Sequence, residues 1–239
     1  MTARLFFIFT LFSIPSFGQQ WMNWSEGAIV YSPIKKIDIT IGGQYRWDVT
    51  NQAYSKTLLS AKVNAKITRF ISIQGRYRRT WLPNEYFYLD QQIQTYGHRL
   101  SAGIQWDIAK TLKRTSEKRK WNVQYTSTYQ WETFKFRRPQ VYWRNQIEVS
   151  HALPLKKCKL QYSIESFYRT NQYYSFINDQ VVYSGLLNEM RYSIGLKYAI
   201  SKQHEIILGI IKRDFQTSKW DVNVLELGYQ FSISSKAKG

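Results

Sequence analysis

Residues 36–47 alternate between apolar and polar side chains for about a dozen positions. The odd-numbered row, from Ile37 to Trp47, is aliphatic, aromatic or glycine, and the even-numbered row, from Lys36 to Arg46, is mostly polar. A period of two predicts an extended strand with one apolar face. The stretch is about twice as long as a usual strand, and it matches the roughly 9–11 residues that a tilted strand needs to cross a bilayer.

The same alternation recurs to the end of the chain. Further strands are predicted at 57–67, 70–81, 95–108, 121–131, 141–151, 158–170, 188–198, 204–215 and 220–233. We therefore predict an all-β fold, a transmembrane antiparallel up-and-down β-barrel of about 10–12 strands, in which an even number makes the first and last strands antiparallel. Residues 24–31 predict a short, weak strand that ends in a Ser32-Pro33 turn. That segment either pairs irregularly, plugs the lumen, or accompanies a further short strand within 19–23.

The predicted connections alternate in length. Those at 32–35, 68–69, 152–157 and 200–203 are short, and those at 48–56, 82–94, 132–140 and 171–187 are longer. Transmembrane barrels have short periplasmic turns and long outer loops, so the longer set is expected outside. The basic connector 107–120 departs from this pattern, because it is long on the expected periplasmic side.

Aromatic residues of the apolar rows are expected at two levels, as girdles around an apolar band. The expected outer girdle is Trp47, Trp81, Tyr96, Trp131, Trp143 and Tyr168, and the inner one is Trp106, Trp121, Tyr198, Tyr229 and Phe231. A soluble sandwich has no reason to sort its aromatic residues in this way. Arg79 also falls on the lipid-facing row, near the outer end, where its guanidinium can reach the headgroups.

The first residues read as an export signal. Arg4 precedes the apolar run 5–14, and Ser16-Phe17-Gly18 places small residues at a cleavage site. We predict a cleaved signal peptide at 1–18 and a single outer-membrane barrel at 19–239. No later run is long and apolar enough for a spanning helix. The negative mean hydropathy does not contradict a membrane barrel, because alternation hides its apolar half.

The formal charge is +18, and the only cysteine is Cys158. An internal disulfide is therefore excluded, and Cys158 is expected to be a small apolar filler. A basic chain often binds nucleic acid, but an exported protein seldom meets it. Anionic lipid headgroups, surface polysaccharide or anionic solutes fit better, and nucleic acid is not an expected partner.

The polar rows are expected to line the lumen, with basic residues in excess. The predicted lumen residues are Arg46, Lys62, Lys66, Arg76, Arg78, Arg99, Arg144, Arg169, Arg191, Lys197 and Arg213, with the acids Asp38, Glu148, Glu165, Glu189 and Glu226. In a narrow barrel such side chains either form an interlocked network of charge-assisted hydrogen bonds or line a narrow anion-preferring passage.

No catalytic pattern is evident. His98, His151 and His204 are not in a His-x-Ser pair, and the adjacent Ser150 and His151 point to opposite faces of a strand. Glycine-rich phosphate loops, a Gly-x-Ser-x-Gly motif and metal-ligand clusters are also missing from the sequence. We expect no enzyme activity, no cofactor and no metal site, and we interpret His98 and His204 as interfacial residues. The expected outer loops carry Tyr86, Phe87, Tyr88, Tyr173, Tyr174 and Phe176, which suit either recognition of carbohydrate or protein or an extension of the girdle.

Three short motifs resemble an uncharacterised Gram-negative outer-membrane β-barrel family, the domain of unknown function number 2490. They are Gly97-His98-Arg99-Leu100, Asn188-Glu189-Met190-Arg191-Tyr192 and the segment 195–204, which resembles that family's penultimate hairpin. The resemblance implies the fold and the location over the mature chain, and it implies no activity or catalytic residue. The C-terminus departs from the usual pattern, because eight residues follow Phe231, the aromatic that barrel-insertion machinery would read.

These observations predict an outer-membrane barrel that has no catalysis and is structural, adhesive or a narrow anion-preferring pore. Its expected partners are outer-membrane lipid, the barrel-insertion machinery, and anionic solutes or surface polysaccharide. The alternatives are a barrel-type lipid-modifying enzyme, which a serine–histidine contact at the membrane face would favour, and a secreted soluble β-sandwich that binds a ligand. The sequence does not identify the ligand, the oligomeric state or the exact number of strands.

Overall fold

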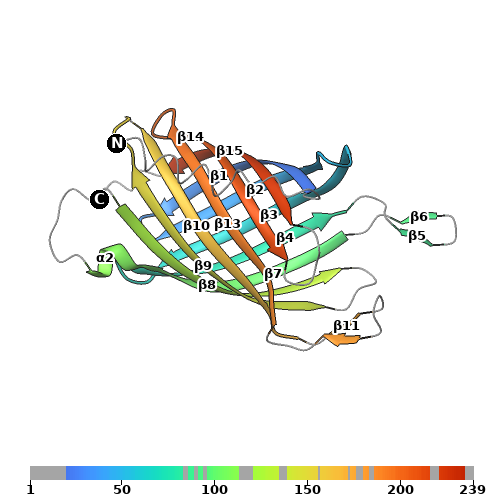
Figure 1. Cartoon of the computed structure of the whole chain (residues 1–239). Helices are drawn as coiled ribbons and strands as arrows, with labels where there is room; N and C mark the ends of the chain where they lie inside the picture. The colour runs from blue at the N-terminus through green and yellow to red at the C-terminus, as the bar shows by residue number, and fades with distance from the viewer. Residues whose placement is uncertain are drawn as a thin grey trace, which may run out of the picture.

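The computed structural model describes residues 20–82, 86–88, 91–93, 96–112, 121–134, 139–155, 157–171, 173–175, 180–182, 186–215 and 221–234. Within these ranges eleven strands form a closed barrel, in the order β1-β15-β14-β13-β10-β9-β8-β7-β4-β3-β2 (Figure 1). Their bounds are β1 Gln20–Ile34, β2 Ile37–Asp48, β3 Ala53–Lys66, β4 Ile71–Trp81, β7 Tyr96–Asp107, β8 Trp121–Phe134, β9 Gln140–Ala152, β10 Cys158–Arg169, β13 Leu186–Ala199, β14 His204–Phe215 and β15 Val222–Ser234. The predicted all-β barrel of 10–12 strands is confirmed.

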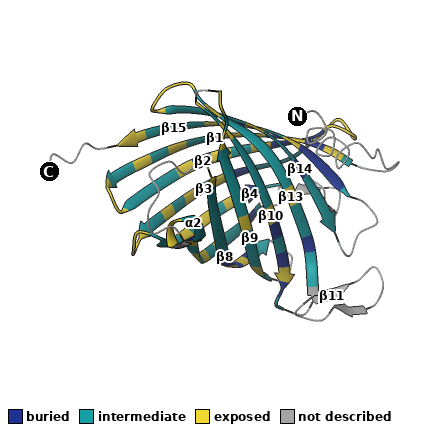
Figure 2. Cartoon of the chain, turned by 60° about the vertical axis from the view of Figure 1, so that its left-hand side comes forward, coloured by how far each residue is buried: buried dark blue, intermediate teal, exposed yellow. Residues whose placement is uncertain are grey.

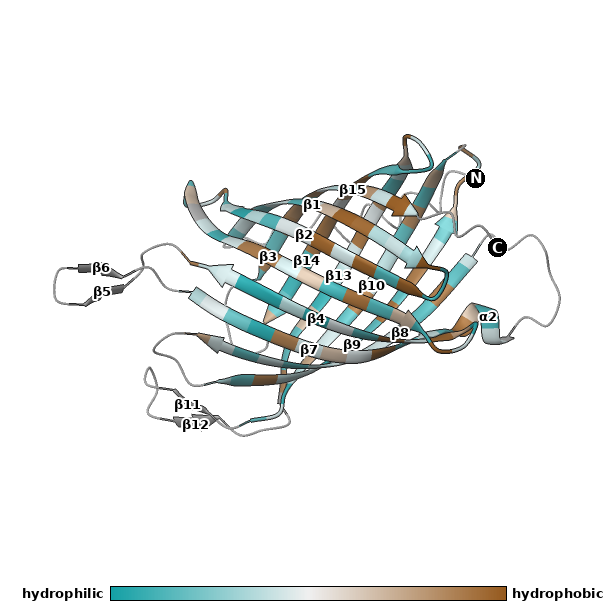
Figure 3. Cartoon of the chain, turned by 180° about the vertical axis from the view of Figure 1, so that it is seen from behind, coloured by the Kyte–Doolittle hydropathy of each residue, from teal (hydrophilic) through white to brown (hydrophobic). Residues whose placement is uncertain are grey.

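Side chains alternate between the lumen and the exterior of the barrel. On β2 the exterior row includes Ile41, which is 57% exposed, whereas the lumen row includes Arg46, which is 7% exposed. Large apolar side chains are exposed in this way along the other barrel strands (Figures 2 and 3). The sheet closes on itself and its apolar rows face outward, so the alternative of a soluble β-sandwich is wrong. This exterior is typical of a barrel surrounded by acyl chains.

The barrel closes through a parallel strand pair, which corrects the predicted antiparallel closure. β1 pairs in parallel with β15 from Gln20 to Ser32 and antiparallel with β2 on its other side. An odd number of alternating strands leaves the first and last pointing the same way, so one pair must be parallel. The segment that was expected to be short and weak is therefore the closing strand. It neither pairs irregularly as a whole nor plugs the lumen.

The turn after β1 lies at residues 35–36, later than the predicted turn at Ser32-Pro33. The register between β1 and β2 shifts between Tyr31 and Ile34. Pro33 is accommodated at this irregularity, where its missing N–H interrupts no regular ladder. The expected long loop 48–56 is also wrong, because β2 and β3 continue to Asp48 and from Ala53.

The two ends of the barrel differ. At one end, residues 35–36, 67–70 and 200–203 connect strands briefly, and the short helix α2 (Ile108–Leu112) begins the longer connector after β7. At the other end, two small hairpins extend the connections, β5 (Tyr86–Tyr88) with β6 (Gln91–Ile93) and β11 (Tyr173–Ser175) with β12 (Gln180–Val182) (Figure 1). We call these the short-turn end and the long-loop end. β1 begins at the long-loop end, and β15 ends at the short-turn end.

A small apolar cluster occupies the lumen side of the closing seam. It consists of Met22, Trp24, Ile211, Val222 and Val224, with Phe215 packed against it. The part of the chain that is described contains no helix long and apolar enough to cross a membrane. The predicted signal peptide, the basic segment 113–120 and the last residues, 235–239, lie outside the described residues.

Candidate functional site in the lumen

The barrel encloses a cavity of about 520 Å³ that is lined almost entirely by polar side chains. Its charged lining residues are Arg46, Lys62, Arg76, Arg78, Arg99, Arg144, Arg191 and Lys197, with Glu26, Glu148, Glu165 and Glu226. Eight basic and four acidic side chains leave an excess of four positive charges. Serine, threonine and glutamine side chains such as Ser101, Thr128 and Gln74 fill the space between them. Such a lining can hold water and anions but offers little to an apolar ligand.

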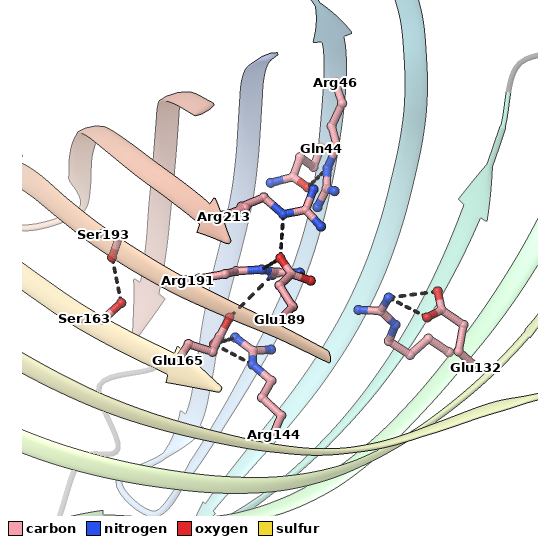
Figure 4. A network of polar contacts seen from close by, with 11 residues as sticks. Gln44, Arg46, Glu132, Arg144, Ser163, Glu165, Glu189, Arg191, Ser193 and Arg213 are labelled. Carbon is pink, nitrogen blue, oxygen red and sulfur yellow. Dashed lines mark hydrogen bonds and ion pairs between the residues drawn. The ribbon is translucent and has the colours of Figure 1, made fainter. Parts of the chain in front are cut away.

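Two carboxylates anchor one wall of the lumen, at β10 and β13 (Figure 4). Glu189 accepts a hydrogen bond from Arg191 Nε at 2.5 Å and another from Arg213 Nε at 2.6 Å. Glu165 accepts from Arg144 Nε at 2.5 Å and lies 3.4 Å from Arg191 Nη1. Both glutamates are almost completely buried, because Glu165 is 4% exposed and Glu189 is 5% exposed. Charge-assisted bonds therefore join β9, β10, β13 and β14 through their side chains.

Arg99 forms a separate ion pair, which joins β7 and β8. Its Nη2 donates to both carboxylate oxygens of Glu132 on β8, at 2.8 and 2.7 Å. Glu132 was not predicted to line the lumen, because the predicted strand ended at residue 131. The inward row of even-numbered residues on β8 continues through Glu132, and this parity was the signal that could have found it.

The opposite wall, formed by β3 and β4, is cationic and carries no carboxylate of its own in the cavity. Lys62 lies directly opposite Arg76 across the β3–β4 ladder, and Arg78 lies directly opposite Arg99 across β4–β7. Like charges in directly opposed positions destabilise a sheet. Within the described residues Lys62, Arg76 and Arg78 form no ion pair, and Arg78 Nε is buried without a hydrogen-bond partner. We call these three residues the cationic wall.

Arg46 is held at the seam by different means. Its guanidinium lies 3.7 Å from the centre of the Trp24 ring, and its Nε donates to Gln44 at 2.7 Å. Across the β2–β3 ladder it faces Lys56, a further opposed pair of like charges. The cation–π contact and the glutamine stabilise the buried arginine, which has no carboxylate partner among the described residues. Trp24 was not foreseen, because the sequence analysis assigned its segment to a weak strand.

The predicted lumen residues do not all line this cavity. Lys66 lies at the short-turn end, 3.3 Å from Asp38 and half-exposed. Three others lie on inward rows without lining the cavity: Arg169 and Glu189, which are buried, and Arg213, whose side chain is 13% exposed. Asp38, the partner of Lys66, does not line the cavity either, and the remaining residues predicted for the lumen surround it. The functional role of the whole set stays a prediction.

The aromatic residues predicted for the girdles lie on outward rows. Trp47, Trp131 and Trp143 are exposed toward the long-loop end, and Trp106 and Trp121 are exposed toward the short-turn end. The indole N–H of Trp143 donates to Ser127 at 2.7 Å, and that of Trp106 donates to Thr111 at 2.8 Å. Their depth in a bilayer stays a prediction.

The three histidines lie on outward rows next to aromatic residues. His98 Nδ1 and Tyr77 Oη are 2.6 Å apart, and His204 Nδ1 and Tyr229 Oη are 2.5 Å apart. His151 stacks on Trp121 with ring centres 4.1 Å apart. The side chain of Ser150 lies on the opposite face of β9 from His151. No group of three or more His, Cys, Asp or Glu side chains in the described ranges could hold a metal ion.

These features define a membrane-type β-barrel with a basic, polar lumen. The chain matches the model of the family described as a protein of unknown function (DUF2490) over residues 21–223, and it belongs to that family. This confirms the family that the short motifs resemble. No curated protein sequence matches the chain. Among solved structures it is similar to a chain described as outer-membrane expressed OmpT of Vibrio cholerae, at 9% identity and a TM-score of 0.35. The match covers 74% of this chain and 54%, about half, of that chain.

Proposed function

We propose that the protein is an outer-membrane barrel without catalytic activity, and that its lumen is a narrow passage preferring small anions. The long-loop end faces outward in this proposal, as in other transmembrane barrels. The observation that carries the proposal is the cationic wall. Lys62, Arg76 and Arg78 face the polar cavity without ion-pair partners in the described part of the chain.

Electrostatics supports an anion in this cavity. A ring or row of basic side chains in a confined pore attracts anions and repels cations, and a charged cleft with low-dielectric walls raises the local concentration of the opposite charge. An anion between Lys62, Arg76 and Arg78 would relieve the repulsion between directly opposed positive charges. The neutral hydroxyl and amide groups of the lining would donate further hydrogen bonds to the anion.

A structural role is the second candidate. The network of Glu165 and Glu189 joins four neighbouring strands through arginines (Figure 4). Such a network would stiffen one half of the wall without requiring transport. An adhesive role would rest on the aromatic residues of the outer loops, Tyr86, Phe87, Tyr88, Tyr173, Tyr174 and Phe176. The structure does not describe the side chains of these residues.

Planar-bilayer recording of the refolded protein tests the proposal. Under a gradient of potassium chloride, we expect a small conductance whose reversal potential indicates chloride preference. A cation-selective conductance would contradict the proposed role of the cationic wall. A correctly folded protein without conductance would exclude the passage and leave the structural role.

A further inference from the structure

The exterior of β4 and β7 carries a column of outward side-chain pairs that changes character along its length. Toward the long-loop end, the directly opposed pairs are Gly75/Ala102, Tyr77/Leu100, Arg79/His98 and Trp81/Tyr96. The column therefore begins small and apolar, continues through bulky side chains, and ends in a guanidinium and an imidazole flanked by aromatic rings. This order follows the profile of a lipid from acyl chain to headgroup.

The small end of the column lies at the meeting point of two apolar hollows in the exterior surface. Their volumes are about 690 and 590 Å³, and both are lined by Val63, Gly75, Ala102 and Tyr129. Bulky side chains surround them, among them Ile104 and Trp131. A Cβ atom added at Gly75 would meet nothing within 4 Å. The missing side chain at Gly75 thus leaves a depression that an acyl chain can fill.

The polar end is built by the cation Arg79 and the imidazole of His98. The Arg79 guanidinium lies 5.1 Å from the Trp81 ring centre and 5.4 Å from that of Tyr96. The His98 ring contacts the Tyr77 hydroxyl through Nδ1 at 2.6 Å. If that hydroxyl donates, His98 Nε2 carries the proton and can donate outward. No ion pair joins Arg79 to a carboxylate of the described residues.

Arg79 differs in this respect from Lys212, another outward cation near the long-loop end. Lys212 on β14 lies 3.3 Å from the carboxylate of Asp221, so its charge is compensated within the protein. The aromatic rings beside Arg79 hold its guanidinium at the surface and leave its N–H groups for an anionic acceptor. The described residues therefore leave the charge of Arg79 open to an anion from the surroundings.

We propose that this exterior surface binds one lipid with a phosphate-bearing, anionic headgroup from the surrounding bilayer. Its phosphate contacts Arg79 and His98, and an acyl chain lies in the hollow at Gly75 and Ala102. Four residues separate the two ends of the column on each strand, which is about 13 Å at the rise of an extended strand. A single lipid can span that distance. This site is independent of any passage through the lumen.

Native mass spectrometry of the refolded full chain tests the proposal, with micelles containing equal amounts of phosphatidylglycerol and phosphatidylcholine. The wild-type protein should retain one phosphatidylglycerol in preference to phosphatidylcholine. Arg79→Gln should reduce that retention about tenfold, the size expected for one hydrogen bond to a charged group. Gly75→Leu should reduce retention of both lipids, because its side chain fills the hollow.

Two matched variants control for general effects. Arg69→Gln removes an exposed arginine at the short-turn end, and Gly27→Leu adds the same side chain at another outward glycine whose Cβ would also meet nothing within 4 Å. Both should retain phosphatidylglycerol like the wild type. Heat-dependent gel migration verifies that each barrel is closed, and Ala102→Leu replaces Gly75→Leu if the latter does not fold.

Equal retention of the two lipids by the wild type would overturn the proposal, as would Arg79→Gln behaving like Arg69→Gln. Displacement of the bound lipid by inorganic phosphate alone would also overturn it, because the cations would then bind a free anion. Loss of lipid in Gly75→Leu but not in Gly27→Leu would support the hollow as the acyl-chain site.

Discussion

Neutralising the cationic wall should weaken the anion preference of the barrel. The perturbation is the triple variant Lys62→Gln, Arg76→Gln and Arg78→Gln, which keeps polar side chains of moderate length in the lumen. It reduces the excess of positive charges around the cavity from four to one. None of the three side chains forms an ion pair in the described part of the chain, so their replacement leaves no described carboxylate without its partner.

The magnitude follows from Coulomb's law. One charge about 6 Å from a permeating ion contributes roughly 0.7 kcal/mol even at the dielectric constant of water. That energy changes the partition of a monovalent anion about threefold, and it changes that of a cation about threefold in the opposite direction. Each single neutralisation should therefore reduce the chloride-to-potassium permeability ratio about tenfold at low salt, and less at high salt because of screening.

The assay is the reversal potential in a planar bilayer under a potassium chloride gradient. Lys66→Gln is the matched control, because Lys66 occupies the same inward row of β3 as Lys62 but lies beside Asp38 at 3.3 Å and outside the cavity. The triple variant should shift the reversal potential toward zero or reverse its sign, and the control should not. A triple variant with the reversal potential of the wild type would refute the reasoning.

Three further predictions concern stability, closure and the membrane environment. Glu189→Gln should lower the free energy of unfolding by roughly 3–5 kcal/mol, because it removes the described carboxylate partner of Arg213 and one of the two partners of Arg191. Urea titration in vesicles should show a much smaller change for Glu205→Gln, because Glu205 forms no ion pair within the described residues. Ser25→Cys with Leu227→Cys in a chain without its native cysteine should form a disulfide, because the two residues are directly paired across the parallel seam. Moving the second cysteine to Gly228, which faces the lumen, should prevent the disulfide. Finally, the refolded protein should need detergent to stay in solution and should migrate anomalously on a gel when unboiled; solubility without detergent would exclude a lipid-facing exterior.

The alternation of side chains was sufficient to predict most of the barrel. A residue in a strand must point to the face opposite that of its neighbours, so an apolar row such as that from Ile37 to Trp47 identifies the exterior wherever it continues. The ladder bonds then place the rows of adjacent strands on the same face. Ten of the barrel strands carry this signal clearly, and their existence was predicted, although several extend further into the loops than expected.

β1 was harder to predict because neither of its rows has a single character. Its outward row includes Asn23, Ser25 and Gly27, and its lumen row includes the apolar Met22 and Trp24 beside Glu26. The lumen side packs in the apolar cluster at the seam, which reverses the usual polarity of an inward row. Backbone hydrogen bonds to two neighbours hold β1 in place, and these require no side-chain pattern.

The ion pairs in the lumen could not be predicted from the sequence, for a different reason. Parity indicates which residues point inward, but it does not say which of them meet. Arg191 contacts Glu189 on its own strand and Glu165 on the next, and this choice depends on the register between β10 and β13. That ladder contains an irregularity between Phe167 and Tyr168, which no periodicity predicts. The unpaired state of Arg78 is likewise a result of register.

Accessibility of spin labels along β2 tests the central claim most directly. Single cysteines would be placed in turn at residues 37–47 in a Cys158→Ser background, labelled, and reconstituted in lipid vesicles. Collision with oxygen, which concentrates among acyl chains, should be high at the odd-numbered positions and low at the even-numbered ones, with a period of two. An absence of alternation, or odd-numbered labels that collide mainly with a water-soluble nickel chelate, would contradict a barrel whose apolar rows face lipid.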